Sequence, residues 1–291
     1  MVAVEANAKI NLTLDILGTR PDGYHEVEMV MQSVGLSDTI RLERSASGIE
    51  LSSGSEELPA DESNLAWKAA RLFLDANEIR AGVRIVVEKR IPIAAGLAGG
   101  STDAAGTLVG MNRLFDTALS AEALCTLGEK IGSDVPFCIM GGTMLASGRG
   151  EKLRRLPSIP PAWIVLAKPP VAVSTAWAYR RFDALAEVVH PDTRAALRAI
   201  SDGSLEGVAA SLGNVLEGVT AEAHEEISAY KRILLQSGAM GALMSGSGPT
   251  VFALTRTEPE ARRAAEALSR ERPEAAVFAV PVTGENVLCN A

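Results

Sequence analysis

The chain has 291 residues, of which 36 are acidic and 28 are basic, so its formal net charge is −8. Hydrophobic residues make up 47% and charged residues 22%, a balance that excludes intrinsic disorder and is typical of globular proteins. The acidic balance argues against nucleic acid as a partner, because neutralising phosphates needs a basic surface. The length favours two domains over one.

The beginning of the chain and its cysteines favour a cytoplasmic protein. Residues 1–9 lack the basic and apolar regions of a signal peptide, and no apolar run approaches the ~18 residues that span a bilayer. The three cysteines, Cys125, Cys138 and Cys289, form neither a disulfide framework nor a C-x-x-C metal pattern. We therefore expect a reducing compartment and no membrane partner. The oligomeric state is not predicted.

The first half of the chain begins with strands and continues with helices. Alternation of apolar and polar residues predicts strands over 10–17, 26–34, 39–43 and 49–51. A helix is expected to begin at Asn64, which can cap it, and a strand follows over 83–87. A glycine-containing loop then leads into a helix that ends near Phe115, and Ser120 caps another helix over 121–131.

The second half alternates helices and short strands. Prolines cluster after Arg155, so we place a domain boundary there and predict domains 1–157 and 158–291. The expected elements are strands over 164–167, 241–244, 251–254 and 276–280, and helices over 175–186, 192–200, 222–237 and 258–270. Helices outside antiparallel strands indicate an α+β fold.

The loop from residue 92 to residue 102 carries the strongest chemical signal. Its letters are PIAAGLAGGST, and a helix follows directly. The backbone N–H groups at the start of a helix are unpaired, and together with the helix dipole they favour a bound anion. Glycines allow a ligand to come close to the backbone. The loop is neither a Walker A motif nor G-x-G-x-x-G, and alone it is more often structural.

Three further segments contain residues suited to phosphate chemistry. Segment 6–12 (ANAKINL) places Lys9 and Asn11 at the beginning of a strand, and segment 132–137 (GSDVPF) places Asp134 in a turn of small residues. A second glycine-rich segment, LMSGSGPTV, spans 243–251 between two strands. Each has a structural alternative: a surface lysine, a capping aspartate and a tight hairpin. Asp103, in the first turn of the helix, suits a cap or a metal.

Together these segments resemble the GHMP kinase superfamily over nearly the whole chain. The resemblance implies a two-domain α+β fold, with an N-terminal half like domain 2 of ribosomal protein S5 and a ferredoxin-like C-terminal half. Segment 18–25 (GTRPDGYH) and segment 132–137 are most like a member that acts on a cytidyl-diphosphate substrate. The implied activity is ATP-dependent phosphorylation of its 2-hydroxyl, in non-mevalonate isoprenoid precursor synthesis.

The resemblance also assigns roles to residues. Asp134 is expected to act as the base, and Lys9 to stabilise negative charge. Tyr24 and His25 are expected to read cytosine, with Tyr179 on the other face of the base and with Asn11 and Thr175 near the substrate. Asn64 and Lys89 match positions that line the adenine pocket. Mg²⁺ is expected to bind mainly through the phosphates of ATP, which contact Pro92, Ile93, Ala94, Ala95, Gly96, Leu97, Ala98, Gly99, Gly100, Ser101 and Thr102.

The loop departs from the family pattern at Ala94, Ala95 and Ala98, where glycines are common. Alanine keeps every N–H donor but disfavours a positive φ, so we expect the same donors with less conformational freedom and an altered ATP affinity. Two alternatives remain open at this point. One is a GHMP kinase with another acceptor, such as homoserine or a mevalonate derivative. The other is an RNA-binding module on the same fold.

Overall fold

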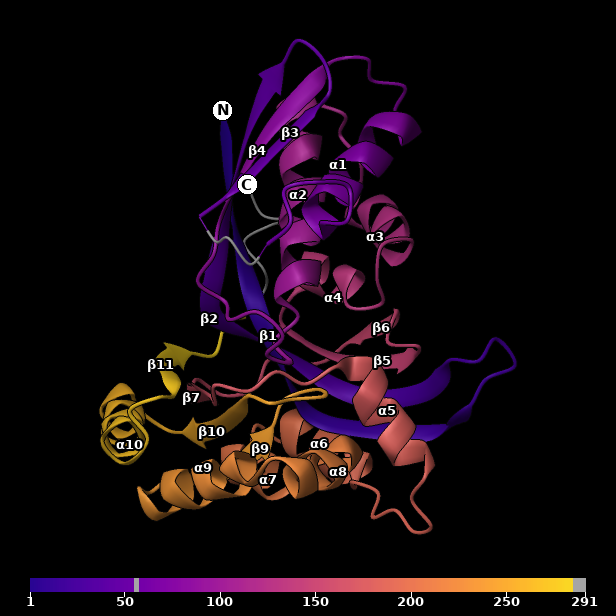
Figure 1. Ribbon diagram of the computed structural model, residues 1–291. Coiled ribbons are helices and arrows are strands. Elements are labelled where there is room, and N and C mark those ends of the chain that lie inside the picture. Colours follow the sequence, from indigo (N-terminus) through magenta and orange to yellow (C-terminus); the bar gives the residue numbers. More distant parts are fainter. Residues whose placement is uncertain (55–57, 285–291) are drawn as a thin grey trace.

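Two β-sheets organise the protein in this computed structural model, which describes residues 1–54 and 58–284 (Figure 1). Cys289 and the end of the predicted second domain lie outside these residues. The larger sheet runs in the order β3-β4-β2-β1-β8, and β5 pairs with both β2 and β6. Its strands are β1 (Val2–Thr19), β2 (His25–Ser45), β3 (Ile49–Ser53), β4 (Gly82–Glu88), β5 (Thr143–Gly148), β6 (Lys152–Arg155) and β8 (Gly213–Asn214).

Strand β2 is longer than the sequence predicted. The two strands expected over 26–34 and 39–43 are parts of one strand that pairs with β1 along most of its length. On its other edge, β2 pairs with β5 from Val27 to Gln32 and with β4 from Thr39 to Ser45. The change of partner satisfies the backbone of a 21-residue strand, whereas the polar residues between the two parts interrupt the apolar pattern.

Four helices cover one face of the larger sheet (Figure 1). They are α1 (Leu65–Ala76), α2 (Gly99–Phe115), α3 (Ala121–Glu129) and α4 (Val135–Met140). The predicted caps are confirmed, since Asn64 accepts a hydrogen bond from the Ala66 N–H and Ser120 accepts one from Ala123. Helix α2 packs very close to β2, because a Cβ at Gly110 would lie 2.3 Å from Leu42.

The second sheet has the order β11-β7-β10-β9 and forms the lower part of the molecule in Figure 1. Its strands are β7 (Trp163–Lys168), β9 (Gly241–Met244), β10 (Val251–Thr255) and β11 (Ala276–Pro281). The helices of this half are α5 (Thr175–Asp183), α6 (Thr193–Ser201), α7 (Leu205–Ala210), α8 (Val215–Ala223), α9 (Glu225–Gln236) and α10 (Glu258–Glu271).

The helix predicted over 222–237 is wrong at its beginning, and α7 was not predicted. His224 has an extended backbone, with φ −137° and ψ 92°, which ends α8 and separates it from α9. Its N–H bonds to the Thr220 carbonyl, and Glu225 and Glu226 then begin α9, where acidic side chains favour a helix start. Helix α7 has only six residues, too few for an apolar periodicity to show in the sequence.

The two halves share part of their core. The predicted boundary at residue 157 lies between β6 and β7, and so between the two sheets. One cluster of buried residues nevertheless contains Ile10 and Leu12 of the first sheet together with Phe252 and Leu254 of the second. Strand β8 also pairs with β1 across this boundary. The division at residue 157 remains a prediction about domains.

Candidate active site

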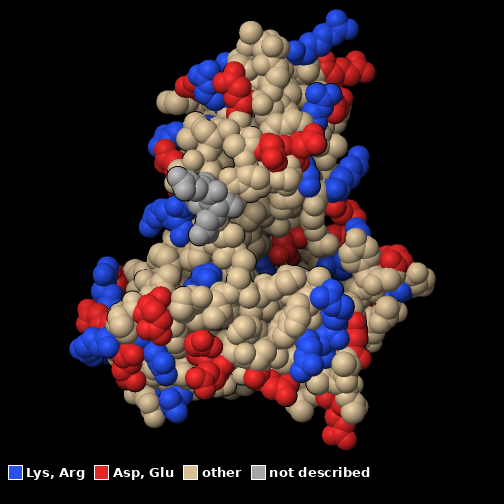
Figure 2. All heavy atoms as spheres, viewed as in Figure 1, with Lys and Arg blue, Asp and Glu red and all other residues tan. Residues whose placement is uncertain are grey.

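A cavity of about 850 Å³ is lined by residues of both halves. The space-filling view shows a hollow between the upper and lower parts of the molecule, with acidic and basic groups at its base (Figure 2). Its wall includes Lys9 of β1, most of the 92–101 loop, Asp134, residues of α5 and the segment 246–248. Residues from these distant parts of the sequence therefore face one space.

The beginning of α2 supplies hydrogen-bond donors to this cavity. The helix begins at Gly99, inside the loop predicted over 92–102, and Ala98 at its N-cap offers no side-chain hydrogen bond. The first N–H groups of a helix lack intrahelical partners. Because Gly99, Gly100 and Ser101 line the cavity, these donors face a space that can hold an anion.

The loop before α2 adopts the left-handed backbone at two of its alanines. Ala94 has φ 50° and Ala98 has φ 60°, close to the conformation that glycine favours. For an L-residue this conformation costs roughly 1–2 kcal/mol. Positive φ is disfavoured for alanine, yet these two alanines adopt it. Alanine keeps the shape of the loop, and the surrounding contacts must offset the strain.

Hydrogen bonds to three successive carbonyls hold the loop in this shape. The Leu97 carbonyl accepts from the Lys9 N–H at 3.2 Å, and the Ala95 carbonyl accepts from the Thr250 N–H at 3.3 Å. Between them, the Gly96 carbonyl accepts from the Ser245 hydroxyl at 2.9 Å. The second glycine-rich segment thus supports the first one. The packing is close, since a Cβ at Gly96 would lie 2.2 Å from the Ser245 carbonyl oxygen.

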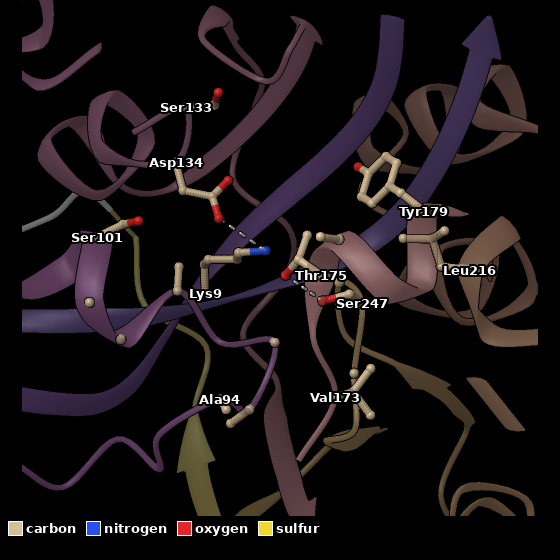
Figure 3. A pocket seen from close by; sticks show the side chains of 18 of the residues that line it. Lys9, Ala94, Ser101, Ser133, Asp134, Val173, Thr175, Tyr179, Leu216 and Ser247 are labelled. Atoms are coloured by element: carbon tan, nitrogen blue, oxygen red, sulfur yellow. Dashed lines mark hydrogen bonds and ion pairs between the residues drawn. The ribbon is translucent and has the colours of Figure 1, made fainter. Parts of the chain in front are cut away.

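Lys9 and Asp134 converge although they lie 125 positions apart in the chain. The Lys9 Nζ is 3.7 Å from an Asp134 carboxylate oxygen, and Figure 3 shows the two side chains pointing toward each other. The Lys9 side chain is buried, while 31% of the Asp134 side chain is exposed. Lys9 also donates to Asn11 Oδ1 at 2.7 Å, which fixes the ammonium group at this point.

Asp134 occupies the N-cap of α4 without capping it. Its side chain makes no cap hydrogen bond, although aspartate at this position usually accepts from the backbone. The alternative that Asp134 is a structural cap is therefore wrong. A helix without its cap loses typically ~1 kcal/mol, and the carboxylate stays available to a ligand in the cavity.

Lys89 is placed differently from Lys9. Its Nζ bonds to Asp38 Oδ2 at 2.5 Å and to Asp103 Oδ2 at 2.9 Å; both carboxylates are buried, and 9% of the Lys89 side chain is exposed. Asp103 therefore does not cap α2, one of the two roles for which the sequence suited it, because the N-cap is Ala98 and the Asp103 carboxylate pairs with Lys89. Burial raises the pKa of Asp103 to about 7, although the Lys89 charge opposes this shift. Lys89 touches the cavity wall but has two of its donors occupied.

Four predicted ligand contacts lie behind the cavity wall. Asn64 uses its side chain as the cap of α1 and donates to the Pro59 carbonyl at 2.8 Å. Asn11 is fully buried behind Lys9, Leu97 belongs to the core, and Thr102 donates to the Asn7 carbonyl at 3.1 Å. None of the four lines the cavity that the described residues form. They position the residues that do.

Aromatic side chains gather at the opposite end of the cavity. Tyr24, His25 and Tyr179 all line it, and the His25 and Tyr179 ring centroids lie 4.8 Å apart. His25 Nε2 lies 2.7 Å from Asp183 Oδ1. Burial, with the nearby charge of Asp134, raises the pKa of Tyr179 to about 12, so its hydroxyl remains a donor.

Sequence reasoning missed several residues at the cavity. The Arg149 guanidinium lies over the Tyr24 ring, 5.1 Å from its centroid, and Ser247 is bonded to Thr175 at 3.0 Å (Figure 3). Arg149 stands alone in a turn, so no local pattern separated it from surface arginines. Ser247 lies within the recognised glycine-rich segment, where its hydroxyl was the available signal.

The chain belongs to the GHMP kinases. The N-terminal domain of this family matches residues 64–142, and the C-terminal domain matches residues 193–274. Membership makes the protein an ATP-dependent small-molecule kinase, and the predicted α+β GHMP kinase fold is confirmed.

Two similar proteins of known name belong to one kind of kinase within this family. A 4-diphosphocytidyl-2-C-methyl-D-erythritol kinase of Exiguobacterium sibiricum is 49% identical, covering 98% of this chain and 99% of the relative. The kinase of the same name from Bacillus subtilis is 47% identical, covering 97% and 96%.

Solved structures agree on the fold. A 4-(cytidine 5'-diphospho)-2C-methyl-D-erythritol kinase superposes with a TM-score of 0.82 at 34% identity, covering 97% of this chain and all of that one. A homoserine kinase of Cytophaga hutchinsonii superposes at 0.79 with 20% identity, covering 98% and 95%, and shows the shared fold alone.

The described residues contain neither a membrane-spanning helix nor a cluster of metal-ligating side chains. Across residues 1–54 and 58–284, no helix is both long enough and apolar enough to cross a membrane. Within the same ranges, no group of three or more histidines, cysteines or carboxylates could hold a metal ion.

Proposed function

We propose that this protein transfers the γ-phosphate of ATP to the 2-hydroxyl of 4-diphosphocytidyl-2-C-methyl-D-erythritol, a step of non-mevalonate isoprenoid precursor synthesis in the cytoplasm. The near-full-length relatives that are 47–49% identical support the substrate. The observation that carries the proposal is the Lys9–Asp134 pair, which lies in one cavity with the beginning of α2 and an aromatic end.

The beginning of α2 would hold the phosphates of ATP. Donors at Gly99, Gly100 and Ser101 face the cavity, and the helix dipole adds positive potential there. Phosphoryl transfer asks a protein mainly to position its substrates and to stabilise charge. The hydrogen bonds that the carbonyls of residues 95–97 accept would keep the loop in place while the N–H donors of α2 bind the phosphates.

Asp134 and Lys9 would act on the acceptor hydroxyl. The uncapped carboxylate of Asp134 can accept a hydrogen bond from that hydroxyl and take its proton. The Lys9 ammonium, 3.7 Å away, stabilises the negative charge that develops on the oxygen and the transferring phosphate. Both groups would thus act at one reacting centre.

Mg²⁺ would enter with ATP. Magnesium prefers oxygen ligands and usually binds through substrate phosphates with one or two protein groups. The oxygen donors that face the cavity close to α2 are Ser101 and Asp134, which fits such a partial protein site (Figure 3). When bound, Mg²⁺ neutralises phosphate charge; the positions of the hydroxyl and its proton depend on the protein side chains.

The aromatic end would bind the cytidyl group. Tyr24 and Tyr179 offer rings for stacking, and His25 and Arg149 offer polar groups to a base edge or a diphosphate. A homoserine or mevalonate substrate has no ring to use these side chains. The aromatic end therefore favours the cytidyl substrate over the other acceptors of the family.

An acceptor panel tests the proposal. ADP release is measured with ATP and Mg²⁺ against the cytidyl substrate, homoserine, mevalonate and phosphomevalonate, and the product is analysed by phosphorus NMR. We expect turnover with the cytidyl substrate and competition by CDP. Turnover with homoserine or mevalonate alone, with CDP inert, would contradict it. Salt-dependent RNA binding without kinase activity would revive the RNA-binding alternative.

Substitution of Tyr24 tests the substrate-reading end. Tyr24→Ala is expected to raise the KM for the cytidyl substrate by about tenfold, because stacking of one base on an aromatic ring is worth roughly 1–3 kcal/mol. The KM for ATP should stay within twofold, since Tyr24 lies at the other end of the cavity. An unchanged KM for the cytidyl substrate would show that the ring does not contact the base.

A further inference from the structure

Asp38 lies behind the cavity but contacts the beginning of the glycine-rich loop. Its side chain is fully buried on β2. One carboxylate oxygen accepts from the backbone N–H groups of Arg90 at 2.6 Å and Ile91 at 2.9 Å, and the other accepts from Lys89 Nζ. Hydrogen bonds to an ionised group are about twice as strong as neutral ones. Three of them converge here at the exit of β4.

Lys89 connects this carboxylate to the far end of the loop. Its ammonium also bonds to Asp103 of α2 at 2.9 Å. Strand β2 contacts both β4 and helix α2 in the upper part of the molecule (Figure 1). The loop from residue 91 to residue 98 thus begins next to Asp38 and ends in α2, which carries Asp103. Lys89 bonds to both carboxylates and so connects the two ends of the loop.

The conformation of the loop explains why it needs an anchor. Ala94 and Ala98 hold left-handed backbones that an unrestrained alanine leaves. The carbonyl contacts of residues 95–97 fix the middle of the loop, whereas Asp38 fixes its beginning. The N–H groups that face the cavity depend on both.

We propose that Asp38 is a positioning residue for nucleotide binding. It touches no substrate atom and acts through Lys89, Arg90 and Ile91, which set the path of the loop into α2. A displacement of about 1 Å at a binding group can cost two orders of magnitude in rate, so an anchor of this kind affects ATP selectively. The inference rests on the proposed function only for the use of ATP.

Calorimetric titration with ATP in the absence of acceptor tests this role in the full chain. Asp38→Asn keeps the size of the side chain and removes its charge. We expect ATP to bind about tenfold or more weakly, with the KM for the cytidyl substrate within twofold of wild type. Because the titration needs no acceptor, its result is independent of which acceptor the enzyme uses.

Two further variants separate positioning from general destabilisation. Asp15 is also a buried carboxylate; it accepts from the Ile16 N–H and lies 2.6 Å from His190 Nδ1, away from the loop. Asp15→Asn should lower the melting temperature and leave ATP affinity unchanged. Asp103→Asn keeps the bonds of Asp38 and reduces the ion pair between Lys89 and α2 to a neutral acceptor, so it should weaken ATP binding about threefold.

The outcomes decide the proposal. ATP binding by Asp38→Asn within twofold of wild type, or equal weakening for ATP and acceptor, would overturn it. If Asp38→Asn does not fold, the Asp103→Asn titration decides instead: unchanged ATP affinity there overturns the proposal, and selective weakening supports it.

Discussion

Lys9 and Lys89 both line one cavity with little of their side chains exposed, yet their surroundings differ. Lys89 bonds to two buried carboxylates at 2.5 and 2.9 Å. Lys9 bonds to the neutral Asn11 and faces one partly exposed carboxylate at 3.7 Å. Two carboxylates bind the Lys89 ammonium, so Lys89 joins elements of the fold. Lys9 retains positive potential and a partner that a ligand can approach, which is the arrangement that charge stabilisation needs.

The largest expected effect concerns the partner of Lys9. Asp134→Asn should lower kcat by about 10²–10⁴-fold, since the amide cannot accept the proton of the acceptor hydroxyl. The KM for ATP should change little, because the donors of α2 remain. Steady-state kinetics with both substrates measure the effect. Unchanged turnover would show that the exposed carboxylate has no part in the reaction.

Replacing each lysine by methionine distinguishes the two roles. Lys89→Met leaves two carboxylates buried without their cation, which should lower the free energy of unfolding by about 3–5 kcal/mol. Lys9→Met should lower the free energy of unfolding by only about 1 kcal/mol, because the Asp134 carboxylate that it leaves unpaired is partly hydrated. The same substitution should abolish turnover. Urea denaturation of both variants checks this. Equal losses of stability would remove the distinction between the two lysines.

The Lys89 cluster should also make stability depend on pH. The pKa of Asp103 is raised from its ordinary value of 3.8 to about 7 in the folded protein. The folded state therefore binds this proton more tightly than the unfolded chain does. The stability that the proton contributes is complete below about pH 4 and is lost as pH rises to about 7.

Asp103→Asn isolates this contribution. As pH rises from 5 to 8, the free energy of unfolding of the wild type should fall by roughly 2–3 kcal/mol relative to that of the variant. Urea denaturation at both pH values measures it. A difference in stability that does not change with pH would show that Asp103 is ionised throughout this range.

Local patterns predicted the elements that depend on local interactions. Asn64 and Ser120 cap helices where the sequence placed them, because a cap and its helix are neighbours in the chain. Strand β2 was split in the prediction because its buried Ser37 and Asp38 interrupt the apolar alternation. Asp38, one of the two interrupting residues, is the carboxylate that anchors the loop. This role is visible only once β2 is paired with β4.

The roles of charged residues were harder to predict from the sequence than the helices and strands. The motifs brought Lys9 and Asp134 forward together, and they converge in the structure. The same reasoning placed Asn64 and Lys89 near the nucleotide, which stays a prediction. What the sequence did not indicate is that Asn64 caps α1 and that Lys89 pairs with Asp38 and Asp103. A sequence states which groups carry charge, but the partners of each group lie on other elements.

The order of residues alone determined the α+β class, the helix that begins after the glycine loop and the family to which the chain belongs. Tertiary structure decided which lysine is held by two carboxylates and which aspartate at a helix N-cap makes no cap hydrogen bond. It also decided that two alanines would hold a left-handed backbone. The physical reason is that charge pairing and loop strain are settled by contacts across β1, β2, β4 and α2, which are distant in the chain and meet only when the sheet closes against its helices.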